Sequence, residues 1–204
     1  MVREWLLDSR VLPVITPGEV ASTVQLCLTL AAAGMRTVEL TLRSPTALDA
    51  MRALAAEVPQ LRVAAGTVLT PQQLELVQRA GALFAVSPGA TPALYQAARA
   101  AAMPLLPGVA TASEVMAGLE QGLECFKLFP ATAIGGETLL KALAAPFPGV
   151  QFCPTGGLGV DNFRRFLALP NVICCGGSWM VAADLVASGD WETIAALASE
   201  AMVE

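Results

Sequence analysis

The sequence predicts an α/β fold in which residues 1–204 form a single (β/α)8 barrel, a TIM barrel, with a short N-terminal helix. Three observations support this prediction. Short apolar or β-branched runs recur eight times, helix-patterned segments separate them, and their centres lie roughly 20–27 residues apart, which leaves room for one crossover helix each. An open doubly wound sheet is the alternative arrangement of the same units.

The eight strand candidates are short apolar runs bounded by glycine, proline or polar residues. They are Val11–Ile15, Thr37–Leu42, Arg62–Val68, Leu83–Ser87, Pro104–Val109, Cys125–Phe129, Gln151–Pro154 and Val172–Cys175. Trp5 precedes the first run, so we expect it in the short leading helix, packed on the barrel.

Helix boundaries between these runs carry local signals. Four helix starts place a hydroxyl N-cap before a proline, which needs no hydrogen bond in the first turn: Thr16–Pro17, Ser44–Pro45, Thr70–Pro71 and Thr91–Pro92. Thr16 with Glu19, and Thr111 with Glu114, have the spacing of a capping box. Three glycines stand where a left-handed residue would end a helix: Gly34, Gly81 and Gly122.

Composition excludes several classes of protein. Hydrophobic residues make up 55% and charged residues 14%, which argues against disorder. The absence of histidine excludes Ser–His and Cys–His nucleophile pairs and histidine metal sites. A net charge of −5 without a basic cluster argues against nucleic-acid binding. Apolar runs are interrupted by glycine and proline, which argues against a membrane span.

Five cysteines are scattered through apolar runs without the spacing of a metal site or a disulfide framework. We therefore expect reduced core thiols, a cytoplasmic location, no metal and no cofactor.

The second strand candidate carries charged residues on one face. Period-two alternation places Glu39, Thr41 and Arg43 together, pointing into the barrel. A carboxylate there is costly unless it is paired or used, so Glu39 is a candidate catalytic group. An ion pair between Glu39 and Arg43 that only fills the barrel is the alternative.

Lys127 is the lysine that lies in a strand candidate, with apolar neighbours. Burial disfavours the ammonium, and a free amine is a nucleophile that forms Schiff bases with carbonyl groups. The alternatives are a side chain that reaches solvent or one that pairs with Glu39. Lys141, in a helical pattern, is expected at the surface.

Glycine pairs follow the last two strands, in Pro154–Leu158 and Cys174–Trp179. Loops at these barrel positions often hold phosphate through backbone amides. Thr155 and Ser178 can add hydroxyl donors, and Thr67 is expected beside Arg43. These residues together predict metal-free carbonyl chemistry on an anionic substrate.

Six motifs in order resemble the KDPG/KHG aldolases, that is, 2-dehydro-3-deoxy-6-phosphogluconate aldolase and 4-hydroxy-2-oxoglutarate aldolase. The resemblance covers nearly the whole chain and lies in VELTLR (Val38–Arg43), AAGTVL (Ala64–Leu69), VSPG (Val86–Gly89), FKLFPA (Phe126–Ala131), FCPTGG (Phe152–Gly157) and GGSW (Gly176–Trp179). It implies a class I, Schiff-base aldolase with a (β/α)8 barrel, a homotrimer, and a small keto acid as substrate.

The resemblance also implies residue roles. Lys127 corresponds to the Schiff-base lysine and Glu39 to the acid/base carboxylate. Arg43 and Thr67 correspond to groups that bind the pyruvate carboxylate, and Pro88 lines the same pocket. The distal phosphate or carboxylate would be held by Thr155, Gly156, Gly157, Gly177 and Ser178. The loop Ala131–Glu137 departs from the family pattern, which bears on substrate preference.

Two other functions fit the same residues. A sugar-phosphate isomerase or epimerase would use Glu39 as base and Lys127 only electrostatically. A non-catalytic binding barrel would not require Glu39 and Lys127 to point inward together.

Overall fold

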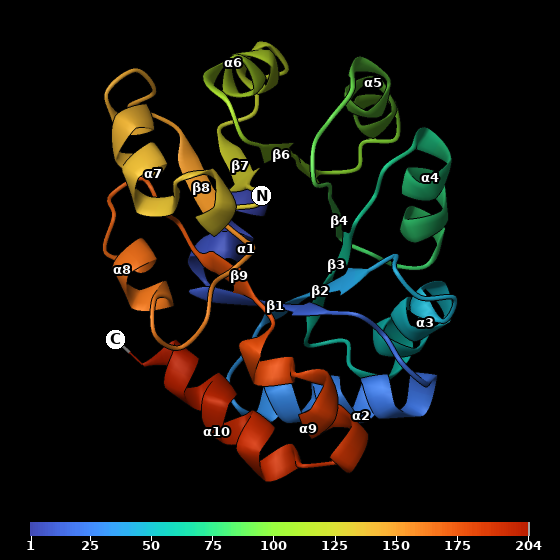
Figure 1. The fold of residues 1–204 in the computed structure, drawn as a ribbon. Helices are drawn as coiled ribbons and strands as arrows, with labels where there is room; N and C mark the ends of the chain where they lie inside the picture. The colour runs from blue at the N-terminus through green and yellow to red at the C-terminus, as the bar shows by residue number, and fades with distance from the viewer. Residues whose placement is uncertain (204) are drawn as a thin grey trace.

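The computed structural model describes residues 1–203, in which parallel strands lie inside a ring of helices (Figure 1). The strands are β1 (Val11–Ile15), β2 (Thr37–Thr41), β3 (Arg62–Gly66), β4 (Phe84–Val86), β5 (Leu105–Leu106), β6 (Gly108–Val109), β7 (Cys125–Leu128), β8 (Gln151–Pro154) and β9 (Cys175–Gly177). The helices are α1 (Val2–Leu7), α2 (Val20–Ala32), α3 (Ala47–Glu57), α4 (Pro71–Arg79), α5 (Pro92–Ala100), α6 (Ala112–Glu120), α7 (Gly136–Ala144), α8 (Phe163–Leu167), α9 (Ala183–Ser188) and α10 (Trp191–Met202), with 3-10 turns η1 (Thr132–Ile134) and η2 (Trp179–Val181).

Hydrogen bonding divides the strands into two parallel sheets. One has the order β5-β4-β3-β2-β1-β9 and the other the order β6-β7-β8. Only Pro107 separates β5 from β6, and isolated bridges pair Phe152 with Val172 and Thr155 with Gly176 between the β8 and β9 segments. The predicted α/β fold with parallel strands is confirmed, whereas one continuous sheet around the barrel is not seen.

Two of the predicted strands differ from the observed ones by more than one or two residues at an end. The fifth run is broken because Pro107 has no amide hydrogen to donate to the ladder. The last strand is Cys175–Gly177, later than the predicted Val172–Cys175. Pairing with β1 holds it there, with Leu12 opposite Gly176, although glycine disfavours strands.

Helix ends agree with the sequence more closely than helix starts. Gly34, Gly81 and Gly122 all have positive φ, as predicted. The Thr70 and Thr91 hydroxyls accept the predicted amide hydrogen bonds. The Thr111–Glu114 capping box is also confirmed.

The caps predicted at Thr16 and Ser44 are wrong. Helix α2 begins after Glu19, and α3 begins after Thr46. The Thr16 hydroxyl instead contacts Thr41, and the Ser44 hydroxyl contacts Thr46. Each hydroxyl is therefore engaged by a contact other than the helix amides that it was expected to cap.

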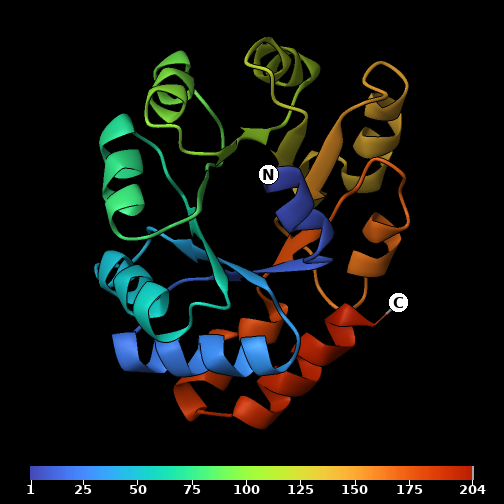
Figure 2. The same ribbon diagram turned by 180° about the vertical axis from the view of Figure 1, so that it is seen from behind.

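The short helix α1 covers the N-terminal end of the strands, as Figure 2 shows. Leu6 is fully buried, and the centroid of the Trp5 ring lies 5.6 Å from that of the buried Phe84 ring of β4. Ser9 donates to Thr37 of β2, which fixes this connection. The predicted packing of Trp5 is confirmed, and the opposite end of the strands is left for a site.

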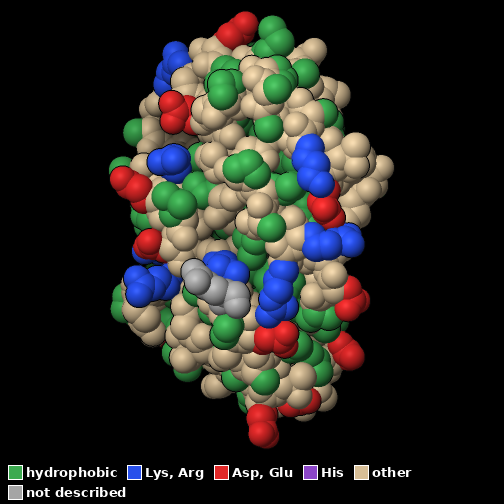
Figure 3. All heavy atoms as spheres, turned by 90° about the vertical axis from the view of Figure 1, so that its left-hand side faces the viewer, with side chains coloured by type: hydrophobic (Ala, Val, Ile, Leu, Met, Phe, Trp, Pro, Cys, Tyr) green, Lys and Arg blue, Asp and Glu red, His purple; other side chains and the backbone are tan. Residues whose placement is uncertain are grey.

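Acidic and basic side chains are interspersed on the side of the molecule that carries α7 and α8 (Figure 3). Arg165 pairs with Glu137 at 3.1 Å and Arg164 with Glu200 at 3.4 Å. Within residues 1–203, no helix is both long and apolar enough to cross a bilayer.

Candidate active site

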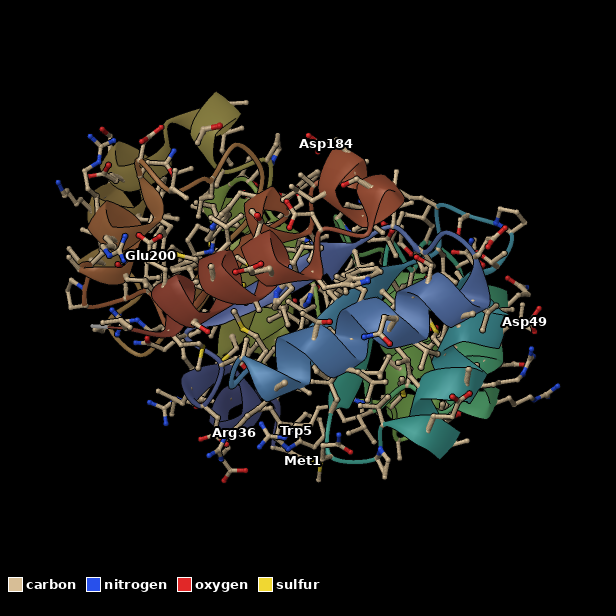
Figure 4. All side chains as sticks on the ribbon, turned by 90° about the horizontal axis from the view of Figure 1, so that it is seen from below. Met1, Trp5, Arg36, Asp49, Asp184 and Glu200 are labelled. Carbon is tan, nitrogen blue, oxygen red and sulfur yellow. The ribbon has the colours of Figure 1, made fainter. Side chains whose placement is uncertain are left out.

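A cavity of about 170 Å³ opens at the carboxyl ends of the strands. Viewed from below, Trp5 lies at one end of the molecule and Asp184 of α9 at the opposite end (Figure 4). Helix α9 follows Ser178 closely in the chain, so the cavity lies at the end away from α1. Its lining contains every predicted site residue: Glu39, Arg43, Thr67, Pro88, Lys127, Thr155, Gly156, Gly157, Gly177 and Ser178.

Lys127 and Glu39 form a buried ion pair at the floor of this cavity. The Lys127 Nζ lies 2.9 Å from Oε1 and 3.2 Å from Oε2 of Glu39. The two side chains are 8% and 1% exposed. The amine was expected among apolar neighbours, but it lies within hydrogen-bonding distance of both carboxylate oxygens of Glu39. Proton exchange between the two groups requires no movement of either strand.

Strand alternation explains why these two groups meet. Lys127 lies in the middle of β7 and Glu39 in the middle of β2, and both strands turn these positions toward the barrel interior. The Phe129 ring centroid lies 5.5 Å from Nζ and forms one wall. Burial raises the pKa of Cys125, on the same face of β7, to about 11, so its thiol stays protonated at neutral pH.

Glycine at position 66 leaves room for the Glu39 carboxylate. A methyl group added at Gly66 would collide with Oε1 of Glu39. The next residue, Thr67, has a φ of 59°, a left-handed conformation that is unusual for threonine. The turn after β3 therefore brings Thr67 to the cavity rim at a cost in backbone strain.

Arg43 lies at the mouth rather than inside the barrel. Strand β2 ends at Thr41, and the Arg43 side chain is exposed. Its Nε donates to Thr41 Oγ1 at 3.1 Å. Its side chain nevertheless lines the same cavity as Glu39 and Thr41. Among residues 1–203, the ion pair of Glu39 is with Lys127 and not with Arg43.

Glycine-rich turns form the far side of the cavity. Gly156 and Gly157 follow β8 with φ of 100° and 80°, values that favour glycine. An added methyl group at Gly177 would collide with the Trp179 ring. Thr155 is buried and donates to the Cys153 carbonyl at 3.3 Å, whereas Ser178 is exposed.

Four lining residues were not among the predicted site residues: Val14, Thr41, Phe129 and Leu158. Period-two alternation already placed Thr41 with Glu39 and Phe129 with Lys127. Both are therefore detectable from the sequence once the inward face is known. No local signal marks Val14 or Leu158.

The family model for KDPG and KHG aldolase matches residues 2–197 of this chain. The chain belongs to this family. It is 50% identical over 197 residues to the KHG/KDPG aldolase of Escherichia coli K12, covering 97% of this chain and 92% of the relative. It is also 50% identical over 192 residues to the 2-dehydro-3-deoxy-phosphogluconate aldolase of Dickeya dadantii, covering 94% of this chain and 90% of the relative.

Solved structures agree with this membership of the KDPG/KHG aldolase family. The KDPG aldolase of Legionella pneumophila, with pyruvate captured as a covalent carbinolamine intermediate, superposes with a TM-score of 0.96. It is 42% identical and covers 98% of both chains. The Zymomonas mobilis enzyme with 3-phosphoglycerate has a TM-score of 0.92, 42% identity, and coverage of 98% and 94%. The isomerase alternative gains no support from these comparisons.

Proposed function

We propose that this protein is a class I aldolase, a carbon–carbon lyase that reversibly cleaves a 2-keto-4-hydroxy acid to pyruvate and an aldehyde. The substrate is 2-dehydro-3-deoxy-6-phosphogluconate, 4-hydroxy-2-oxoglutarate or both, and the aldehyde is glyceraldehyde 3-phosphate or glyoxylate. The buried contact of 2.9 Å between the Lys127 amine and the Glu39 carboxylate carries this proposal.

Lys127 is the proposed nucleophile. Glu39 accepts one proton from the ammonium, which frees the Nζ lone pair to attack the C2 ketone. The same proton then leaves with the carbinolamine hydroxyl as water, and a protonated imine remains. Because the carboxylate is ionised again after this step, it is ready for the cleavage.

Glu39 is the proposed acid and base of the cleavage. It removes the C4 hydroxyl proton, the C3–C4 bond breaks, and its electron pair moves into the iminium to give an enamine. The aldehyde departs, Glu39 returns its proton to C3, and water hydrolyses the imine to release pyruvate. The carboxylate that contacts the amine thus serves imine formation, bond cleavage and the protonation of C3.

The remaining lining groups are proposed to bind the two ends of the substrate. Arg43 and Thr67 hold the pyruvate carboxylate at the rim, and Pro88 closes the pocket beside them. The distal phosphate or carboxylate lies against Thr155, Gly156, Gly157, Gly177 and Ser178, where the glycines let backbone amides approach an anion.

The architecture of the chain is part of the proposal. We treat residues 1–204 as one domain with a closed (β/α)8 barrel, in which β5 and β6 are one strand interrupted at Pro107. The two bridges between the β8 and β9 segments support this closure. Five free, buried cysteines support a cytoplasmic location. A charged fraction of 14%, against about 25% in typical proteins, and exposed Met116 and Leu119 on α6 support a homotrimer.

Substitution of Lys127 tests the chemistry directly. Lys127→Arg keeps a cation opposite Glu39 but cannot present a neutral amine, so it is expected to fold and to lose turnover completely. Lys127→Ala also loses turnover, and the uncompensated buried carboxylate is expected to cost about 3–5 kcal/mol of stability. Pyruvate release from each candidate keto acid is the measurement.

Reduction with borohydride in the presence of pyruvate is the matching chemical test. A covalent adduct is expected on the peptide that contains Lys127 in the unsubstituted protein and is absent in Lys127→Arg. Full activity in Lys127→Arg, or an adduct on Lys141 instead, would contradict the assignment.

A further inference from the structure

Thr41, the last residue of β2, is a buried threonine between Glu39 and Arg43 that takes no part in the proposed chemistry. Its side chain lines the cavity and is 1% exposed. A buried hydroxyl must find partners, and the partners of Thr41 come from two segments: Ile15 and Thr16 at the end of β1, and Arg43 after β2. We propose that Thr41 is a positioning residue that fixes the Arg43 guanidinium for binding the substrate carboxylate. This inference rests on the proposed function of Arg43.

The hydrogen bonds of Thr41 use its full capacity. Its hydroxyl donates to the Ile15 carbonyl at 3.0 Å and accepts from Arg43 Nε at 3.1 Å. Thr16 Oγ1 lies 3.2 Å away. Because a hydroxyl has one hydrogen, and that hydrogen goes to the carbonyl, Thr16 must be the donor in this contact. Thr41 therefore donates one hydrogen bond and accepts two.

This arrangement fixes the orientation of Arg43 as well as its position. Since Nε is engaged by Thr41, the two terminal nitrogens are the groups left to meet a carboxylate end-on, the bidentate geometry that arginine favours. Arg43 is exposed and lies beyond the end of β2, so the strand itself does not restrain its long side chain. Restraint by the Thr41 hydroxyl reduces the rotamer freedom that would otherwise be lost on binding.

The Ile15 carbonyl anchors this network to the neighbouring strand. Ile15 is the last residue of β1, and it pairs with Leu40 of β2. The hydrogen bond from the Thr41 hydroxyl to the Ile15 carbonyl adds a contact between β1 and β2 one residue closer to the mouth of the cavity. The position of Arg43 is thus set by two strands rather than by its own loop.

The test measures how pyruvate concentration governs trapping by borohydride at Lys127. In Thr41→Val, the half-saturating pyruvate concentration is expected to rise about ten-fold, because a hydrogen bond to a charged group is lost. Thr41→Ser keeps the hydroxyl and is expected to match the unsubstituted protein. Acetone, a ketone without a carboxylate, is expected to be trapped equally by all variants.

Thr37→Val is the matched control for a purely structural effect. Thr37 is also a buried threonine of β2, and its hydroxyl accepts from Ser9 at the end of the barrel remote from Arg43. Its valine variant is expected to lose stability with no change in half-saturation. In the Arg43→Gln background, Thr41→Val is expected to add no further shift, because the partner through which it acts is gone.

Several results would overturn the inference. These are an unchanged half-saturation in Thr41→Val, an equal loss of acetone trapping, or an additive effect in the double variant. Failure of the unsubstituted protein to trap pyruvate at all would instead refute the proposed function. The two failures are therefore distinguishable.

Discussion

Gly66 contributes to the site because it has no side chain. Gly66 stands against the Glu39 carboxylate, so the acid/base group occupies space that any other residue at position 66 would fill. The requirement at Gly66 is one of close approach, since its φ is not in the left-handed region. Substitution there alters the position of Glu39 without altering its chemistry.

Gly66→Ala is expected to lower kcat by about 10²-fold, because displacement of a catalytic group by about 1 Å can cost that much. Pyruvate release per folded molecule is the measurement. Gly118→Ala on α6 is the control, since its added methyl group would collide with the buried Phe126 ring of β7, which does not line the cavity. That variant is expected to lose about 1–3 kcal/mol of stability from overpacking and to keep its kcat. Equal kcat in both variants would show that Glu39 tolerates the shift.

Period-two alternation made the inward pair detectable from sequence. Glu39 and Lys127 stand in runs whose other face is apolar, so each was expected to point inward. Alternation does not give the distance between two strands that are far apart in sequence, and the ion pair at 2.9 Å therefore required the fold. Arg43 was expected on the same face, but it stands beyond the end of β2, so alternation alone could not predict that its side chain lies exposed at the mouth of the cavity.

The N-terminal cap of helix α6 contains a titratable side chain, Glu114. Glu114 Oε2 accepts from the Ala110 amide at 2.7 Å and from the Thr111 amide and hydroxyl, each at 2.9 Å. Partial burial acts in the opposite direction, but these hydrogen bonds outweigh it and lower the pKa of Glu114. The charged form also favours the positive end of the helix dipole.

Because the pKa of Glu114 is lower in the folded state, its stabilising contribution is present above the unfolded pKa and is lost as pH falls through the folded one. Glu114→Gln keeps an acceptor oxygen but removes the charge. Its free energy of unfolding is expected to be about 0.5 kcal/mol lower than that of the parent at neutral pH, and equal in acid. Denaturant titrations at both pH values measure this. Glu120→Gln, on the exposed end of the same helix, is expected to show no such gap, and a pH-independent gap in Glu114→Gln would contradict the assignment.

Local signals predicted helix boundaries well where the hydroxyl had no other partner. Thr70, Thr91 and Thr111 cap their own helices as expected. Thr16 carries the same Thr–Pro signal, but its hydroxyl contacts Thr41 across the strands. A tertiary partner of this kind leaves no trace in the nearby sequence, so the cap at Thr16 could not be distinguished from the others.

For the molecule as a whole, the alternation of strands and helices along the chain was accessible from the sequence. The nine strands of residues 1–203, where eight were predicted, and their division into two sheets were not. The Pro104–Val109 run contains its own interruption at Pro107, and β9 is built from Cys175, Gly176 and Gly177. Glycine has little strand propensity, so its pairing depends on β1 and on the close approach of Thr155 to Gly176. A strand that depends on its neighbours in this way cannot be predicted from its own residues alone.

The proposed homotrimer is tested by the mass of the protein in solution. Sedimentation equilibrium is expected to give three times the 21.1 kDa of the chain. We expect the exposed apolar side chains of α6 to form part of the interface. The double variant Met116→Lys with Leu119→Lys is therefore expected to have a lower mass in solution, because two like charges would be buried at the interface without partners. Glu75→Lys on α4 is the control for added charge. A single-chain mass in the parent would refute the trimer.

Helix α1 covers the N-terminal end of the strands, and the cavity opens at their carboxyl ends. Under the proposed chemistry, the imine bond to Lys127 holds the pyruvate portion covalently while the C3–C4 bond breaks. The aldehyde therefore leaves first, water then enters and hydrolyses the imine, and pyruvate leaves last.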